Sequence, residues 1–431
     1  MRERLLIVYF VAILLGIATG IVGSLFQIAI HNLDFFIKQF LGFVQTKGGS
    51  TGLVSALISM IFLILAWLMV RRFAPEAAGS GVQEIEGALI NERPIFWRRL
   101  LPVKFIGGVL AISSKLVLGR EGPTIQMGGN LGDMFGELFN FSSERRHTFI
   151  MAGAAAGLAS AFNAPLAGVL FVVEELRNEF NFTFTNLKTV AIACIMATMV
   201  LHFIVGSGPA IPMDVFGLPS LRSLWLFFVL GIIVGFVGLL FNHTLINTLY
   251  LTDKLAKWPR VFYLLLVGAA IGYLAFYKPD IVGGGYHIIQ QAVDLPPNFS
   301  ALILLLLLRF LTTMVSYSTG VPGGIFAPML ALGSLVGSCA FFILDYLLDD
   351  LSVHPGMFAV AGMGALFAAA IRAPITGIIL VVEMTQNYLL ILPLMVCCLT
   401  STTIMQLAGN PPIYTQLLRR TLKKAGKELT H

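Results

Sequence analysis

The stretch MAGAAAGLASAFNAPLAGVLFVVE, Met151–Glu174, is repeated later in the chain as VAGMGALFAAAIRAPITGIILVVE, Val360–Glu383. The two stretches align without gaps and are identical at 11 of 24 positions, including an Ala-Pro step and a terminal Val-Val-Glu. Two earlier pairs of motifs are separated by nearly the same number of residues. One pairs the GSGV at Gly79 with the GGGY at Gly283. The other pairs Pro123, Gly128 and Gly132 with Pro328, Gly333 and Gly337. Because the matches keep the same order, we predict two homologous halves.

The predicted halves are residues 1–205 and 215–420, with a connecting segment at 206–214 and a short basic tail at 421–431. Membrane transporters often contain such a repeat in inverted form, with the substrate site between the halves. If each half crosses the membrane an odd number of times, the two halves must have opposite orientations. An even total number of crossings fits two odd halves or two even halves, so the total alone does not prove inversion. We therefore predict an all-α membrane protein made of an inverted repeat with many tilted and broken helices.

Composition supports the membrane location. Hydrophobic residues make up 57% of the 431 residues and charged residues only 12%, about half the charged share of a typical soluble domain. Apolar runs occur from end to end, several of them near the ~20 residues that span a bilayer as a helix. These runs are Leu5–Ile30, Leu53–Val70, Trp225–Leu240, Phe262–Phe276, Leu302–Leu311, Ala327–Leu348, Met357–Val382 and Leu389–Leu407.

The net charge is +6, and the basic residues gather in a few clusters, including both ends of the chain. Such clusters typically flank membrane segments on the cytoplasmic side, so we expect both termini in the cytoplasm, and nucleic-acid binding is a poor interpretation. A bacterial inner membrane is the expected location. The four cysteines lie inside apolar segments without CxxC spacing, so neither a disulfide nor a metal site is predicted. No cofactor motif is present either.

Glycine- or proline-containing interruptions divide the apolar segments, and several recur in both halves. They are AAGSGVQ, LGREGPT, FNAPLAG, STGVPGGIFAP and IRAPITG. Each break starts a new helix, whose first N–H groups are unpaired and carry a partial positive charge. Non-helical backbone at membrane depth is tolerated only inside the protein or along a polar cavity. The breaks therefore predict a shared anion site without a full counter-charge. A packing role for single breaks remains an alternative.

Three of these stretches resemble the signature sequences of the CLC family of chloride channels and proton/chloride antiporters. They are GSGVQEIEGAL from Gly79, GREGP from Gly119 and GGIFAPMLALG from Gly323, and NPPIYTQLL near the end fits the same family. The resemblance covers nearly the whole chain. It implies a homodimer with one pathway per subunit, and the short tail predicts a member without C-terminal nucleotide-sensing domains.

The resemblance also implies the binding residues. The central chloride would be held by the hydroxyls of Ser80 and Tyr414 and by the backbone N–H groups of Ile325 and Phe326. The backbone of Gly119, Arg120 and Gly122 would form a second anion site toward the extracellular side, where the Glu121 side chain competes with chloride as a gate. The charge of Arg120 is better interpreted as bracing the loop or packing in an ion pair.

One position departs from the family pattern, because Gln83 stands where members usually have proline. Glutamine restores a backbone N–H and frees φ, so the entry of the helix after Ser80 could differ. The function is less affected, since serine at position 80 agrees with a preference for chloride over nitrate. Relatives that export fluoride usually replace this serine.

Carboxylates decide between exchange and simple conduction. Glu175 matches the intracellular proton-transfer glutamate of antiporter members, where channel members usually have valine. Intramembrane carboxylates are functional by default, although Glu175 could instead be a solvated helix-end residue paired with Arg177. Glu174 could help to hydrate the proton path, whereas Glu383 is interpreted as a structural or capping carboxylate.

We therefore predict a secondary active transporter that exchanges chloride for protons across the membrane. An uncoupled chloride channel of the same fold is the alternative, and Glu175 argues against it. A membrane-embedded hydrolase is disfavoured because HExxH does not occur and no Ser/His pair lies on neighbouring breaks. The expected partners are chloride, protons and the lipid bilayer.

Overall fold

The computed structural model describes residues 2–177, 180–217, 219–293, 298–348, 351 and 353–427. The last four residues of the predicted tail lie outside the described residues. The first half contains α1 (Arg2–Thr46), α2 (Thr51–Phe73), the 3₁₀ turn η1 (Pro75–Ala77), α3 (Val82–Leu89), α4 (Trp97–Ser113), α5 (Glu121–Leu138), α6 (Ser143–Phe162), α7 (Pro165–Glu174) and α8 (Phe184–Ile204).

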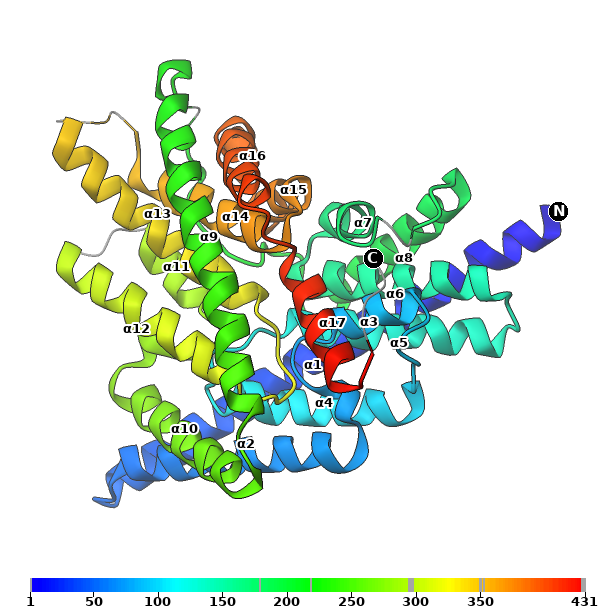
Figure 1. Cartoon of the computed structure of the whole chain (residues 1–431), viewed down its shortest axis with the longest axis horizontal. Helices are drawn as coiled ribbons and strands as arrows, with labels where there is room; N and C mark the ends of the chain where they lie inside the picture. Colours follow the sequence, from blue (N-terminus) through cyan, green and yellow to red (C-terminus); the bar gives the residue numbers. More distant parts are fainter. Residues whose placement is uncertain are drawn as a thin grey trace.

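The second half repeats this order. It contains η2 (Leu221–Ser223), α9 (Leu224–Asp253), α10 (Lys257–Tyr277), η3 (Pro279–Ile281), α11 (Tyr286–Val293), α12 (Phe299–Tyr317), α13 (Phe326–Leu348), α14 (Pro355–Ile371), α15 (Pro374–Thr385), η4 (Tyr388–Leu390) and α16 (Ile391–Leu407), after which α17 (Ile413–Lys424) closes the chain. In both halves two long helices are followed by a 3₁₀ turn and an eight-residue helix. Helix α2 packs against α10, and α7 against α15 (Figure 1).

Eight helices of the described residues are long and apolar enough to cross a membrane. They include every predicted apolar run except Met357–Val382, and they add α8, which the sequence analysis missed. The run Met357–Val382 is divided into α14 and α15, because Pro374 cannot continue a helix and Arg372 turns the chain with φ 65°. The break at IRAPITG is thereby confirmed.

Small residues allow the inner helices to approach closely. A Cβ on Gly153 of α6 would collide with the carbonyl oxygen of Gly128 in α5, and Gly362 of α14 stands in the same relation to Gly333 of α13. These glycines are matched positions of the two halves. The four cysteines are buried and unpaired, as expected for core residues.

Helix α17 continues to Lys424, into the segment predicted as the basic tail. The last turns of this helix are anchored to the end of α9, where Asp253 accepts from Arg420 and pairs with Lys424. These ion pairs hold the helix that carries Tyr414 against the second half.

Candidate anion and proton site

The starts of α3, α5 and α13 are tied together by backbone hydrogen bonds near the centre of the molecule. Gly119 and Gly324 exchange a pair of these bonds, with N···O distances of 2.8 and 2.7 Å. Gly79 donates to the carbonyl of Val321 and accepts from Gly323. Segments that are about 200 residues apart in the chain are thus fixed side by side, and the three predicted breaks form one structure.

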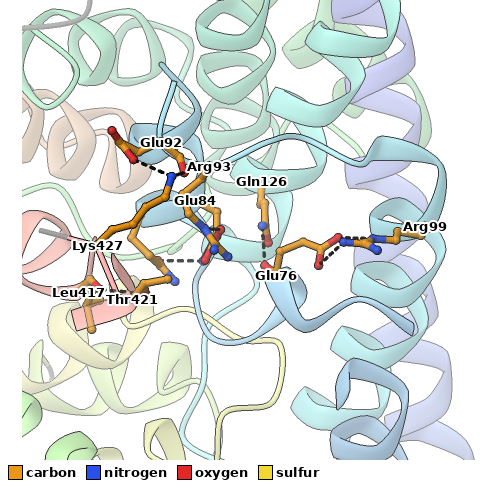
Figure 2. Close-up of polar contacts among 11 residues, drawn as sticks. Glu76, Glu84, Glu92, Arg93, Arg99, Gln126, Leu417, Thr421 and Lys427 are labelled. Atoms are coloured by element: carbon orange, nitrogen blue, oxygen red, sulfur yellow. Dashed lines mark hydrogen bonds and ion pairs between the residues drawn. The ribbon is translucent and has the colours of Figure 1, made fainter. Parts of the chain in front are cut away.

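The loop before α3 is held by side chains of α4 and α5. The Lys104 ammonium is fully buried and donates to the carbonyls of Ala77 and Gly79. Gln126 donates to the carbonyl of Glu76, whose carboxylate pairs with Arg99 (Figure 2). Buried carbonyls need such donors, so this loop is strongly constrained just before Ser80.

The matching loop of the second half is held in the same way. Arg309 of α12 is fully buried and donates to the carbonyls of Asp280, Val282 and Gly283. The backbones of the two loops also agree, since Gly79 and Gly81 have φ of 64° and 92° and Gly283 and Gly285 have 73° and 97°. Only glycine adopts such conformations easily, so the Gly-x-Gly pattern is explained in both halves.

The predicted central ligands Ser80 and Tyr414 lie together. Their hydroxyl oxygens are 3.5 Å apart, and both side chains are fully buried. This separation is long for an O–H···O bond, so each hydroxyl can still donate to a ligand. The Ser80 N–H approaches the Tyr317 hydroxyl at 3.4 Å. Three uncharged groups therefore meet at the start of α3.

The predicted backbone ligands Ile325 and Phe326 lie at the start of α13, where the N–H groups have no partner within the helix. The Phe326 ring stacks on Tyr414, with ring centroids 5.7 Å apart, and also contacts Phe171 of α7. Ser80, Tyr414 and the start of α13 are thus neighbours, as the resemblance implied.

Glu121 is the first residue of α5 and is fully buried. Its Oε1 accepts from the hydroxyl of Tyr286, while its Oε2 has no hydrogen-bond partner among the described residues. The side chain folds back over Gly119, where a Cβ would collide with Oε2 and would also lie close to Ala327 of α13. The carboxylate is therefore placed between the starts of α5 and α13.

The neighbours of Glu121 account for the other residues of GREGP. A Cβ on Gly122 would collide with Ser80 Oγ, so only glycine lets the two helix starts approach. The Arg120 guanidinium donates to the carbonyl of Ala161 and lies 5.4 Å from the centroid of the Tyr286 ring. It braces the loop through a carbonyl and a ring, and it forms no ion pair within the described residues.

Gln83 compensates for the missing proline. Its side-chain Oε1 accepts from the N–H of Gly81, immediately before α3. Helix α3 starts at Val82, so the glutamine side chain binds the backbone at the entry of its own helix. The next two acidic residues contact side chains: Glu84 pairs with Arg93 (Figure 2), and Glu86 accepts from Thr415.

Glu174 and Glu383 both cap helices. Glu383 accepts from the N–H groups of Leu166 and Ala167 at the start of α7, which confirms its interpretation as a capping carboxylate. Glu174 accepts from Ile375 and Thr376 at the start of α15. The contacts of Glu174 are therefore those of a structural residue, as in its repeat partner.

Glu175 follows the end of α7 and is partly exposed. It lines a pocket of about 350 Å³, whose wall also contains Glu86, Arg177, Arg372 and Thr415. The ring of Phe171 in α7 contacts the ring of Phe326, which stacks on Tyr414. Glu175 lines this pocket, whereas the fully buried Glu121 does not.

A second pocket, of about 410 Å³, opens on the other side of Glu121. It is lined by Gly119, Arg120 and Tyr286 and reaches the ion pair of Lys115 with Asp34. Tyr286 is the residue that the sequence analysis missed. The match of GGGY with GSGV could have revealed it, because this match places Tyr286 at a helix start equivalent to that of α3.

These features define a class: a polytopic membrane protein of two matched halves, whose helix starts and one buried carboxylate converge inside it. The chain belongs to the voltage-gated chloride channel family, whose model matches residues 62–406. The H(+)/Cl(-) exchange transporter ClcA of Vibrio vulnificus is 46% identical over 420 residues, which cover 96% of this chain and 90% of the relative. The protein of that name from Vibrio cholerae is 45% identical over 423 residues, with the same coverage.

Solved structures show the same fold. A slow cyanobacterial Cl⁻/H⁺ antiporter superposes with a TM-score of 0.93 at 40% identity, covering 97% of this chain and 99% of the other. A CLC-type fluoride/proton antiporter gives a TM-score of 0.78 at 19% identity, covering 96% and 98% of the two chains. The second likeness supports the fold alone.

Proposed function

We propose that this protein is a secondary active transporter that exchanges chloride for protons across the membrane. The observation that carries the proposal is the fully buried Glu121 carboxylate, which lies where the starts of α5 and α13 meet. Relatives at 45–46% identity over 96% of the chain are named as H(+)/Cl(-) exchange transporters.

Chloride binds between uncharged donors in this proposal. The hydroxyls of Ser80 and Tyr414 and the N–H groups of Ile325 and Phe326 hold the central ion. Helix starts attract anions through partial charges, and several partial charges bind an ion loosely enough for passage. The backbone of Gly119, Arg120 and Gly122 forms the outer position.

Glu121 is the gate. Its carboxylate and chloride are both monoanions, so the donors around the outer position can serve either. Protonation removes the charge of Glu121 and weakens its hold on this position, and chloride then replaces it. Chloride and proton movements are coupled because one position cannot hold both anions.

Protons reach the gate from the pocket that contains Glu175. The buried rings of Phe171 and Phe326 contact each other, and Phe326 stacks on Tyr414. In this proposal the proton crosses this apolar region by transient water. We assign no proton transfer to Glu174, because both of its carboxylate oxygens accept bonds from the start of α15.

The remaining features of the proposal concern architecture. The two halves, 1–205 and 215–420, form an inverted repeat, which the matched element order and the cross-capping of α7 and α15 support. Both termini face the cytoplasm of a bacterial cell, given the basic clusters that flank the spans. The protein works as a homodimer, moves its ions without converting them chemically, and needs no cofactor.

Flux measurements on the reconstituted protein test the roles of both glutamates and separate exchange from the alternative, an uncoupled channel. Glu121→Gln mimics permanent protonation, so chloride flux should continue while proton movement stops. Glu175→Gln should also lose proton movement. Glu137→Gln, on an exposed carboxylate at the end of α5, is the matched control and should remain coupled. Proton coupling that persists in Glu175→Gln would refute the role of that residue.

A further inference from the structure

Tyr286 contacts the gate carboxylate directly. It is the first residue of α11, and its hydroxyl donates to Oε1 of Glu121 at 2.5 Å. Within the described part of the chain, Tyr286 is the only side chain that donates a hydrogen bond to Glu121, and the backbone N–H groups of Glu121 and Ala327 also act on this carboxylate. The ring lines the outer pocket of about 410 Å³. The hydroxyl is therefore placed between the outer pocket and the gate.

The position of Tyr286 is fixed from two sides. Gly285, with φ 97°, starts the turn into α11 and accepts from Ile288 and Ile289. A Cβ at Gly285 would collide with Arg309, the buried cation that holds the carbonyls of this loop. On the other side the Arg120 guanidinium lies over the Tyr286 ring. A ring held in this way loses little conformational freedom when it binds the gate.

We propose that Tyr286 is a positioning residue that latches the ionised Glu121 side chain in the outer anion position and so sets the rate of exchange. This inference rests on the proposed function. A hydroxyl donates more strongly to a carboxylate than to a neutral carboxylic acid. The latch therefore holds the charged gate and weakens when Glu121 takes up a proton, which ties the opening of the gate to protonation.

Other charged and titratable groups face this pair and stay in place when the hydroxyl is removed. Arg120 comes from the loop before α5, and Tyr414 comes from α17. The outer pocket adds Lys115 and Asp34, which pair with each other, and also Lys38 and His287. Because the hydroxyl is the only group removed, a change in the pH profile of Tyr286→Phe reports on the latch.

Tyr286→Phe removes the hydroxyl and keeps the ring against Arg120. A hydrogen bond to an ionised group corresponds to roughly a tenfold change in an equilibrium constant. We expect the initial rate of chloride/proton exchange in liposomes to rise about tenfold where the gate is ionised, and less at acidic pH. The fall of the rate with increasing pH should begin at a higher pH. Equal rates and equal pH profiles in variant and wild type would overturn the latch.

Tyr263→Phe is the matched control. It also removes a hydroxyl that bonds within the protein, to Ser318 and the carbonyl of Val315, away from the gate. Its pH profile should equal that of the wild type. As a second measurement, calorimetry in detergent should show tighter chloride binding in Tyr286→Phe, because the competing carboxylate is held less firmly. Unchanged or weaker chloride binding would count against the latch.

The Glu121→Ala background separates the two proposals. If Glu121→Ala retains proton coupling, the gate itself is wrong, and the proposed function fails first. If Glu121→Ala loses proton coupling but Tyr286→Phe alone changes neither the exchange rate nor its pH profile, only the latch is wrong. In the double variant the Tyr286 substitution should add nothing to the chloride flux of Glu121→Ala. A further rise there would show that the ring acts on the pocket and not through the gate.

Discussion

Glu174 and Glu383 each cap a helix in the opposite half of the molecule. Glu174, at the end of α7, accepts from Ile375 and Thr376 at the start of α15, and Glu383 of α15 accepts from Leu166 and Ala167 at the start of α7. Carboxylates at helix starts satisfy unpaired N–H groups and the helix dipole. The repeated Val-Val-Glu therefore joins the two halves through a reciprocal pair of contacts.

Removing either cap should destabilise the fold and leave transport coupled. Glu174→Ala and Glu383→Ala should each lower the free energy of unfolding by about 1–3 kcal/mol, because N–H groups at a helix start lose a charged acceptor. Thermal unfolding in detergent measures this loss. The chloride-to-proton ratio of Glu174→Ala should equal that of the wild type; loss of coupling at normal stability would restore Glu174 to the proton path.

Gly119→Ala should displace the gate. The new methyl group would occupy the place of Glu121 Oε2, so the carboxylate must leave its position between the two helix starts. We expect chloride flux with reduced proton coupling. Gly42→Ala is the control, since nothing lies within 4 Å of a Cβ there, and it should be neutral or slightly stabilising in its helix.

Lys104→Met should weaken chloride binding, although Lys104 is not itself one of the proposed chloride ligands. The buried ammonium holds the carbonyls of Ala77 and Gly79. Without it the Ala77 carbonyl is left unpaired, at a cost of about 1–3 kcal/mol, and the Gly79 carbonyl keeps only its bond from Gly323. The loop before Ser80 then loses its fixed geometry. Calorimetric titration with chloride checks this, with the exposed Lys257→Met as control. Unchanged affinity in Lys104→Met would place the chloride site away from this loop.

The hydroxyls of Ser80 and Tyr414 should partly substitute for each other in binding chloride. Removing one leaves the other as a donor, whereas Ser80→Ala combined with Tyr414→Phe removes both. We expect the double variant to lose about 1–3 kcal/mol of chloride binding energy, measured by the same titration. If the double variant binds chloride as tightly as the wild type, the site lies elsewhere.

Much of this structure could be predicted from local patterns. Repeated motifs predicted the matched halves. Gly and Pro predicted the breaks, because these residues change the backbone within a few positions. Composition alone joined α14 and α15 into the single run Met357–Val382, because both helices are apolar on either side of Arg372, whereas the motif IRAPITG predicted the break. Apolar composition indicates that a segment is buried or faces lipid. It does not distinguish one long helix from two short ones.

The missed features depend on contacts between distant segments. Tyr286 reaches Glu121 across 165 positions of the chain, and Glu174 reaches α15 across about 200. Nothing near Glu174 in the sequence distinguishes a cap for a remote helix from a residue that hydrates a proton path. The resemblance supplied the members of the proposed chloride site, and the structure supplied the side chains that hold their loops.

The central claim is that chloride movement drives protons against their gradient. The direct test places the purified protein in liposomes with a chloride gradient and no initial pH difference, clamps the membrane potential, and records internal pH. Our account predicts proton movement opposite to that of chloride, continuing after a pH gradient opposes it. Chloride flux without any uphill proton movement in the wild type would contradict the account and leave an uncoupled chloride channel.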